Sequence, residues 1–477
     1  MAVLTQRSVT RTLFSMALPM LAGTFAMNAY QLTDAWFVSR LGTLPLAAMG
    51  FVYPVVILLT FVAGGLGVGV TTLASHAMGR HDYRDAARLV SHGVTLTVST
   101  SVALSIIGYL SIDWIFARLG ADAATMPLIR QFMRIWFLGA LTMSLPMMGN
   151  GILISCGDSK AASRFMVLGA LLNVALNPIL IFGYLGLPPM GIAGSALATV
   201  LAQAVSTTWL LYLLGRKHHL LAFAGWRLRD YLVSFRRIVG FAIPSVLSMM
   251  LMPISAAVIT RILSGCGPEA VAATGAAQRI EMFAFVIPMA LGMSLTPFVS
   301  QNFGAGRVDR VRQARKTATW FALGYGAVVA VLFVAGAPVM ASLFTDDPKV
   351  AATLVSYIRI ISFGYGMMEV HRYCGFFLTG MHKPISATAL NAIRVLVLLI
   401  PLSYLGSYLW GVMGVFSGRL VTDVIVGCIG IVWVARTLKS VPSTAAACAP
   451  LTASIAVDAS DPQKGPAQVA VFDDGSH

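Results

Sequence analysis

The sequence predicts an all-α polytopic membrane protein of twelve transmembrane helices, arranged as two six-helix bundles. Of the 477 residues, 57% are hydrophobic and only 11% are charged, whereas soluble proteins carry about 25% charged residues. One water-soluble core cannot bury this much apolar surface. In a bilayer, apolar side chains face the lipid and helices satisfy their own backbone hydrogen bonds. The two halves of the chain also repeat each other.

Twelve apolar runs are long enough to cross the hydrocarbon core, which needs roughly 20 residues per helix. Prolines interrupt several runs, as membrane helices tolerate when neighbours satisfy the freed carbonyls. The first run is too long for the apolar part of a signal peptide, so we expect it to remain as the first span. The runs lie near residues 13–38, 45–74, 91–117, 128–154, 164–186, 191–214, 238–262, 275–302, 317–344, 352–380, 385–408 and 410–436.

The distribution of basic residues predicts the orientation of these spans. With both termini placed in the cytoplasm, the inside segments hold 21 of the 33 Lys and Arg residues, and the outside segments hold seven. Cytoplasmic loops carry such an excess. The net charge of +15 therefore indicates topology rather than a nucleic-acid surface, because no aromatic residues interleave with the basic ones. We expect a multi-pass protein of the cell inner membrane in contact with the lipid bilayer.

The chain divides into four parts. Residues 1–214 form the N-terminal six-helix bundle, and residues 238–439 form the C-terminal one. The segment 215–237 between them is basic and mostly polar, which indicates a cytoplasmic linker. Residues 440–477 are rich in Ala, Ser, Pro and Asp, a composition typical of a disordered cytoplasmic tail.

The internal repeat is visible at a constant offset of 225 residues, at which Pro19 matches Pro244. Because each half has an even number of spans, the halves share one orientation and are parallel repeats. Two such bundles with a cavity between them suit alternating access to the two sides of a membrane. Further matches at this offset are Gly67 with Gly292, Thr71 with Thr296, Ser75 with Ser300 and Gly79 with Gly304.

Three stretches resemble the multidrug and toxic compound extrusion (MATE) family. They are similar to the family's first helix, to its eighth helix with the following loop, and to the Asn-x-x-x-Asp-Pro pattern of its fifth helix. Their order and duplication make the resemblance fairly specific. They read ALPMLAGTFAMNAYQLTDAWFVSRLGTLPLAAMG from Ala17, AAQRIEMFAFVIPMALGMSLTPFVSQNFGAGR from Ala276 and LLNVALNPILIFGYLGL from Leu171.

The resemblance implies a V-shaped pair of bundles around a central cavity, a monomer, and export of amphipathic, often cationic drugs in exchange for H⁺ or Na⁺. The acid in the first helix places the chain nearer the DinF-like branch of the family. The NorM-like branch usually has a glutamate in helix seven, where this chain has Met252. Asn177 stands where an aspartate is common in helix five, so a site with two carboxylates is not expected here.

Asp34, in the outer half of the first span, is the main candidate for cation coupling. A carboxylate in hydrocarbon is costly unless it is paired, hydrated or protonated. No Lys or Arg lies deep within the first six spans, so we expect Asp34 to take up and release a cation, with Tyr30, Asn173 and Asn177 as hydrogen-bond partners. The alternative is that Asp34 only caps or orients its helix near the interface.

The second half carries more charges in its spans, and two interpretations of them stay open. Glu369 and Arg372 are three residues apart, so they share one helical face and can neutralise each other. The charges form either a structural network or part of a substrate site. Glu281, beside Arg279, is the best functional candidate among them, and the resemblance implies a cation-binding acid near Glu369. Arg419 and Asp423 are four residues apart and are expected to pair in the same way, and Arg394 is the remaining charge.

Three function classes follow from these observations. A drug-exporting secondary antiporter is the first, and an exporter or flippase of a lipid-linked or polar metabolite is the second, which a basic cavity would favour. A membrane-embedded enzyme such as a prenyl transferase needs an Asp-rich loop motif, and ATP hydrolysis needs GxxxxGK[ST]; the sequence has neither. No spacing of Cys or His suggests a metal site, so neither a metal nor a cofactor is predicted.

The methionines near residues 143–148 and 249–252 are either packing residues or the lining of an adaptable pocket.

Overall fold

The computed structural model describes residues 3–222 and 227–440, and the predicted tail beyond residue 440 lies outside the described part of the chain. The first half consists of a short 3₁₀ turn, η1 (Val3–Thr5), and six long helices with one short helix, α4, between them. Their bounds are α1 (Val9–Ser39), α2 (Thr43–Gly79), α3 (Tyr83–Leu110), α4 (Ile112–Arg118), α5 (Met126–Ser155), α6 (Ser159–Phe182) and α7 (Ile192–Tyr212), with short turns η2 (Tyr184–Gly186) and η3 (Leu213–Lys217).

The second half repeats this order with more breaks inside its helices. Its α8 begins at Leu228, so the end of the segment predicted as a linker is helical. The bounds are α8 (Leu228–Ser264), α9 (Pro268–Ala284), α10 (Val286–Gly304), α11 (Val308–Ser342), α12 (Pro348–Ile361), η4 (Ser362–Gly364), α13 (Tyr365–Gly380), α14 (Pro384–Ala392), η5 (Ile393–Leu399) and α15 (Ile400–Lys439).

These helices make up the twelve predicted spans. Ten stretches of the described residues are long and apolar enough to cross a membrane, and α9 with α10 form a further span that is bent by 58°. One of the ten, Pro384–Lys439, contains two spans, because the backbone leaves the helical conformation at Trp410 and Gly411. Gly411 has a φ of 58° there, which glycine adopts without steric cost.

The bend between α9 and α10 has a local cause. Pro288 has no N–H and cannot bond to the carbonyl of Ala284 four residues earlier. The hydroxyl of Tyr325, from α11, donates a hydrogen bond of 2.7 Å to that carbonyl. The break is therefore stabilised by a neighbouring helix, as buried backbone groups in a membrane require.

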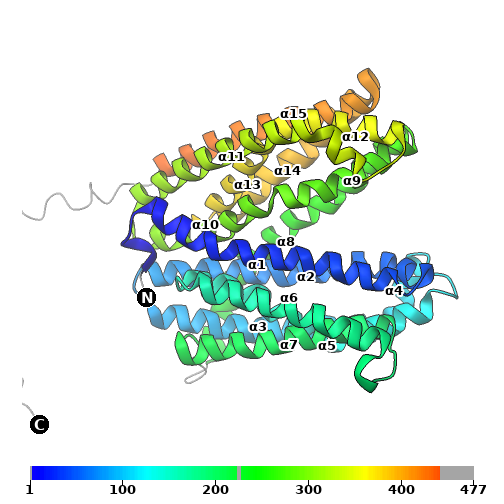
Figure 1. Ribbon diagram of the computed structural model, residues 1–477. Helices are drawn as coiled ribbons and strands as arrows, with labels where there is room; N and C mark the ends of the chain where they lie inside the picture. Colours follow the sequence, from blue (N-terminus) through cyan, green and yellow to red (C-terminus); the bar gives the residue numbers. More distant parts are fainter. Residues whose placement is uncertain (1–2, 223–226, 441–477) are drawn as a thin grey trace, which may run out of the picture.

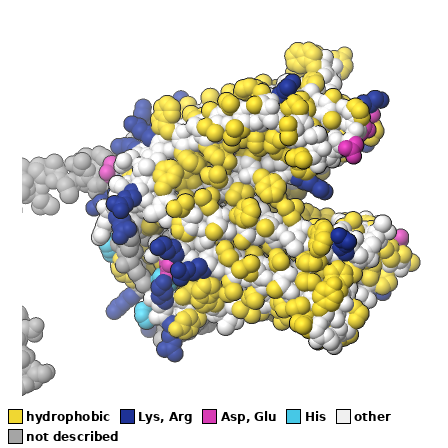
Figure 2. Space-filling view, in the orientation of Figure 1, with side chains coloured by type: hydrophobic (Ala, Val, Ile, Leu, Met, Phe, Trp, Pro, Cys, Tyr) yellow, Lys and Arg dark blue, Asp and Glu magenta, His cyan; other side chains and the backbone are white. Residues whose placement is uncertain are grey.

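The two halves form two lobes that meet at the end of the molecule where the described chain begins and ends, and separate toward the opposite end (Figure 1). Apolar side chains cover the middle of the surface, and basic side chains gather at the end where the lobes meet (Figure 2). The fold is thus the V-shaped pair of six-helix bundles that the resemblance implied.

Close backbone packing joins the lobes at this end. A Cβ atom on Gly79 of α2 would lie 2.0 Å from the carbonyl oxygen of Gln301, and one on Gly304 of α10 would lie 2.3 Å from that of His76. The contact is reciprocal, since the repeat matches Gly79 with Gly304 and His76 with Gln301. Only glycine permits this approach.

The segment before α1 reinforces this contact between the lobes, which we call the seam and which is formed by Gly79 with Gln301 and Gly304 with His76. Leu4 is buried, and its carbonyl accepts hydrogen bonds from Asn302 at 3.3 Å and Arg310 at 3.1 Å. Arg307 donates to the carbonyl of Thr5 at 2.9 Å. The start of the first half is therefore held by the end of α10 and the start of α11 in the second half.

Candidate functional site

A cavity of about 970 Å³ lies between the two lobes. Helices of both halves line it, among them α1, α5 and α6 on one side and α8, α9, α10, α13 and α15 on the other. Pockets of about 300–1,000 Å³ are typical for small-molecule ligands. The cavity is thus large enough for a drug-sized or metabolite-sized molecule.

Methionine is the most frequent side chain in the wall of this cavity. Unbranched, polarisable methionine side chains adapt to ligands of different shape. Of the six methionines singled out from the sequence, Met143, Met147 and Met252 line the cavity, whereas Met148 is buried in the core. The full set is Met27, Met143, Met147, Met166, Met252, Met282, Met289, Met293 and Met368.

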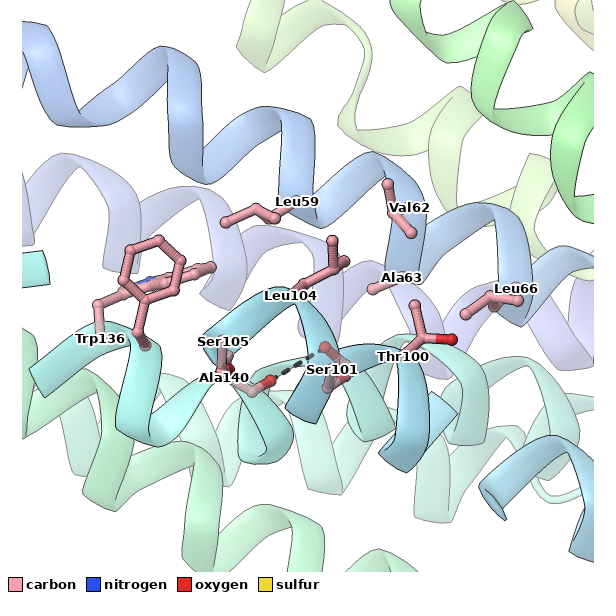
Figure 3. A pocket seen from close by; sticks show the side chains of 12 residues that line it. Leu59, Val62, Ala63, Leu66, Thr100, Ser101, Leu104, Ser105, Trp136 and Ala140 are labelled. Atoms are coloured by element: carbon pink, nitrogen blue, oxygen red, sulfur yellow. Dashed lines mark hydrogen bonds between the residues drawn. The ribbon is translucent and has the colours of Figure 1, made fainter. Parts of the chain in front are cut away.

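A second pocket, between α2, α3 and α5 in the first lobe, is much smaller (Figure 3). Its volume is about 20 Å³, which is enough for roughly one water molecule. Apolar side chains such as Leu59, Leu104 and Trp136 dominate its wall. It cannot hold a transported organic molecule, so the central cavity is the candidate substrate site.

Asp34 lies near the C-terminal end of α1, where it is half-buried next to α6 and α7. Its Oδ1 accepts hydrogen bonds from Asn177 Nδ2 at 3.0 Å and from Ser195 Oγ at 2.9 Å. Asn177 also donates to Asn173 Oδ1 at 2.8 Å. The structure therefore brings together three of the predicted residues and adds Ser195, which the sequence analysis missed.

The polar group around Asp34 continues along α7. Asn173 Nδ2 donates to Thr199 Oγ1 at 2.9 Å, and Tyr30 also hydrogen-bonds with Thr199. Tyr30 thus belongs to the group through Thr199 rather than by a hydrogen bond to Asp34 itself. The chain of polar side chains runs from α1 through α6 to α7.

Asp34 has no basic partner among the described residues. Both of its hydrogen bonds go to Oδ1, so no described side chain donates to Oδ2. One of the two carboxylate oxygens is therefore not engaged by any side chain that the structure describes.

Three acids within the spans of the second half, Glu281, Glu369 and Asp423, are arranged differently, because each one is paired with an arginine. Arg419 NH2 lies 2.9 Å from Glu281 Oε1 and 3.0 Å from Oε2. Arg394 donates from Nε and NH2 to Asp423 Oδ1, at 3.1 and 2.9 Å.

Arg372 forms the third pair, with Glu369 at 3.1 Å. All three arginines line the cavity. Arg419 also lies 3.9 Å from Asp423, so the i, i+4 pair expected from the sequence is present but is the weaker of its contacts.

Arg279, proposed as the neighbour of Glu281, points elsewhere. It is exposed, and no ion pair connects it with a described residue. Glu281 instead accepts hydrogen bonds from Tyr357 at 2.8 Å and Tyr365 at 3.3 Å. These partners lie on α12 and α13, and adjacency in sequence gave no signal for them. Among the described residues, no cluster of His, Cys, Asp and Glu could hold a metal ion.

Comparison with known proteins connects this geometry to a family. The MatE family model matches residues 19–179 and 244–405, one match in each half. A FAD transporter of Shewanella oneidensis is 34% identical over 419 residues, covering 88% of this chain and 93% of the relative. A probable multidrug resistance protein of Bacillus subtilis, YoeA, is 26% identical, covering 72% and 75%.

Solved structures of similar proteins have the same fold. A crystal structure of the Vibrio cholerae MATE transporter VcmN in the bent form superposes with a TM-score of 0.85, at 26% identity, covering 91% of this chain and 97% of that one. A MATE structure in the straight conformation gives a TM-score of 0.85 with 92% and 98% coverage. The twelve-helix arrangement is therefore shared with these proteins.

Proposed function

Because this chain belongs to the MatE family of membrane transporters, we propose that it is a secondary antiporter that exports small organic molecules through the central cavity in exchange for H⁺ or Na⁺. The observation that carries the proposal is Asp34. It is an acid within a membrane span that has two hydrogen-bond donors on one oxygen and no basic partner among the described residues. An intramembrane acid is tolerated when it is hydrated, paired or neutralised, and a cation on Oδ2 neutralises it.

In this proposal, Asp34 binds a cation from the side where the cation is more abundant and releases it on the other. Asn177 and Ser195 hold the carboxylate in place, and Asn173, Thr199 and Tyr30 hold Asn177 and the surrounding helices. Rocking of the two lobes about the seam exposes the cavity to each side in turn. With both termini in the cytoplasm, the conformation described here is the outward-open one.

Amphipathic drugs are the first candidate substrates. The methionine-rich wall suits ligands of varied shape, and several relatives carry names such as multidrug export protein, as in Staphylococcus haemolyticus. A transporter that is a monomer and sits in the inner membrane fits this activity.

A phosphate-bearing polar metabolite is the second candidate, and two observations favour it. The relative named FAD transporter is 34% identical, more than the 22–26% of the multidrug proteins. Three arginine side chains line the cavity, and guanidinium groups bind phosphates well.

Transport assays in proteoliposomes test the proposal. Efflux of the cationic dye ethidium and of FAD is measured with a pH gradient and a sodium gradient imposed separately. The proposal expects transport driven by one of them, and loss to the level of protein-free liposomes in Asp34→Asn. Asp113→Asn, which alters an exposed acid of the same half, serves as the control. Undiminished gradient-driven transport by Asp34→Asn would remove this acid from the mechanism.

A further inference from the structure

The wall of the cavity in the second lobe contains three arginines, and their donors are used to different degrees. Arg394 directs Nε and NH2, the two donors on one edge of its guanidinium group, at Asp423. Arg419 directs NH2 at Glu281 and NH1 at Tyr357. In each of these two arginines, two of the three guanidinium nitrogens form hydrogen bonds with the protein itself.

Arg372 is different, because only its NH1 is engaged. NH1 lies 3.1 Å from Glu369 Oε1 and 3.9 Å from the sulfur of Met289. Nε and NH2 form no hydrogen bond with any described residue. At 26% exposure, its side chain is the most accessible of the three, compared with 15% for Arg394 and 21% for Arg419.

The acid behind Arg372 is also incompletely satisfied. Glu369 is 1% exposed, and neither of its oxygens has a partner with hydrogen-bond geometry among the described residues. The ion pair with Arg372 is therefore held by charge alone rather than by a fixed bidentate arrangement. Such a pair leaves Arg372 free to turn its unused edge toward a ligand.

We propose that Arg372 is the residue that binds the phosphate, or a similar anionic group, of the transported molecule. This inference rests on the proposed function, since it places a substrate in the same cavity. Nε and NH2 form the planar pair of donors that matches two oxygens of a phosphate. NH1 stays beside Glu369, so anion binding does not leave that buried acid without a counter-charge.

The surroundings of Arg372 define the remainder of the ligand. Its guanidinium lies 5.2 Å from the ring centroid of Phe285, and Met289, Met293 and Met368 line the same wall. Aromatic and sulfur-containing side chains favour a flat, apolar body. The substrate class that fits is an aromatic compound bearing a phosphate.

Binding of flavin mononucleotide (FMN) and riboflavin to the purified protein tests this inference, because the two compounds differ only by one phosphate. Flavin fluorescence quenching at equilibrium is expected to give at least about tenfold tighter binding of FMN, the effect of a charge-assisted bidentate contact. Arg372→Gln is expected to remove this difference while leaving riboflavin affinity unchanged. Glu369→Gln, which frees NH1 and removes a negative charge, is expected to strengthen FMN binding.

Matched variants keep the test independent of folding defects. Arg359→Gln removes one positive charge from an exposed position on α12 and is expected to leave FMN binding unchanged. The double variant Arg372→Gln/Glu369→Gln removes both charges of the pair, so no buried acid is left unpaired if Arg372→Gln alone fails to fold. Arg372→Lys, which has the charge without the planar fork, is expected to give intermediate discrimination.

Inorganic pyrophosphate, added as a competitor, tests the anion site without the flavin body. Equal affinity for FMN and riboflavin, or absence of Arg372-dependent binding of both FMN and pyrophosphate, would overturn the inference. The assay needs no ion gradient, so it separates the two proposals. Arg372-dependent binding without gradient-driven transport would count against the antiport mechanism alone. Gradient-driven transport of FAD that does not change in Arg372→Gln would count against the anion site alone.

Discussion

The two lobes share one fold but treat buried charge in opposite ways. In the first lobe, Asp34 has polar neighbours and no basic partner among the described residues. In the second lobe, each of three acids is paired with an arginine. At the offset of 225 the repeat matches Asp34 with Ile259. At the offset of 220, which aligns Gly191 and Gly194 with Gly411 and Gly414, it matches Thr199, a member of the polar group around Asp34, with Arg419. Equivalent places in the fold therefore contain a single acid in one half and an ion-pair network in the other.

This difference indicates a division of roles between the lobes. An acid without a counter-charge changes the net charge of its surroundings when a cation binds, which coupling requires. A set of paired charges keeps its net charge constant and orients side chains toward the cavity. We therefore expect changes in the first lobe to affect coupling, and changes in the second to affect stability and substrate selection.

The largest expected effect is on stability, from Arg394→Met in the second lobe. Asp423 is 1% exposed, and the variant leaves it with only the 3.9 Å contact to Arg419. Removing one partner of a buried ion pair costs about 3–5 kcal/mol. Thermal unfolding in detergent is expected to show a clear fall in the midpoint. Asp34→Asn, which removes an acid that has no ion pair, should melt at or above the wild-type temperature. Equal melting of the two variants would contradict the contrast between the lobes.

A smaller effect is expected at the seam, where the lobes are equivalent rather than different. In Gly79→Ala the added methyl group would lie 2.0 Å from the carbonyl oxygen of Gln301, and such overpacking costs about 1–3 kcal/mol. Cysteine crosslinking across the seam is expected to fall, because the lobes no longer approach each other fully. Gly240→Ala is the control, since a Cβ there has open space around it. A normal crosslinking yield in Gly79→Ala would mean that this contact does not hold the lobes together.

We also expect the stability of the protein to depend on pH through His382, which lies in the loop between α13 and α14 and contacts His76 of the seam. Desolvation, followed by the charges of His76, Arg237 and Arg80, lowers the pKa of His382 from 6.5 to about 3. The folded state then binds fewer protons than the unfolded state. Stability is complete above pH 6.5 and falls between about pH 6.5 and 3, by up to about 1.4 kcal/mol per pH unit.

Replacing this histidine tests the sign. His382→Asn suits the positive φ of 63° at this position, because Asn tolerates that conformation. The melting temperature of the variant is expected to fall less than that of the wild type between pH 7.5 and pH 5. Parallel falls in both proteins would show that His382 does not contribute to the acid sensitivity.

The smallest effect is expected from an exposed ion pair in the first lobe. Arg130 Nε lies 2.5 Å from Asp113 Oδ1, but the two side chains are 42% and 63% exposed. Solvent screens exposed pairs, and many contribute nothing measurable. Arg130→Gln should therefore melt and transport like the wild type. A large loss of stability would mean that pairing, rather than burial, decides which charges matter in this protein.

The sequence predicted the spans and the main coupling candidate for physical reasons. The apolar runs follow from the lipid environment, and Asp34 stands out because acids are rare in such runs. Of the three predicted partners, Tyr30 lies on α1 together with Asp34, and Asn173 and Asn177 lie on the neighbouring helix α6. All three belong to the polar group around Asp34. Their roles in transport remain predictions.

Other features of the structure were not marked by any pattern in the neighbouring sequence. Ser195 is one small residue among many on α7, so nothing marked it as a donor to Asp34. The pair of Glu281 with Arg419 joins residues that are 138 positions apart, whereas i, i+4 spacing favoured Asp423 as the partner of Arg419. The bend at Phe285 depends on a tyrosine from another helix. Each of these features arises from packing between helices that are distant in sequence.

The reciprocal contact of Gly79 and Gly304 also bears on the origin of the chain. Each glycine approaches the backbone of the residue that is equivalent to the other's partner. A surface that meets its own counterpart in this way is the interface of a twofold-symmetric homodimer. A six-helix ancestor could therefore have paired with a second copy of itself through this single site before duplication and fusion joined the copies. Once fused, the copies no longer had to stay identical, and an acid could be kept in one of them only.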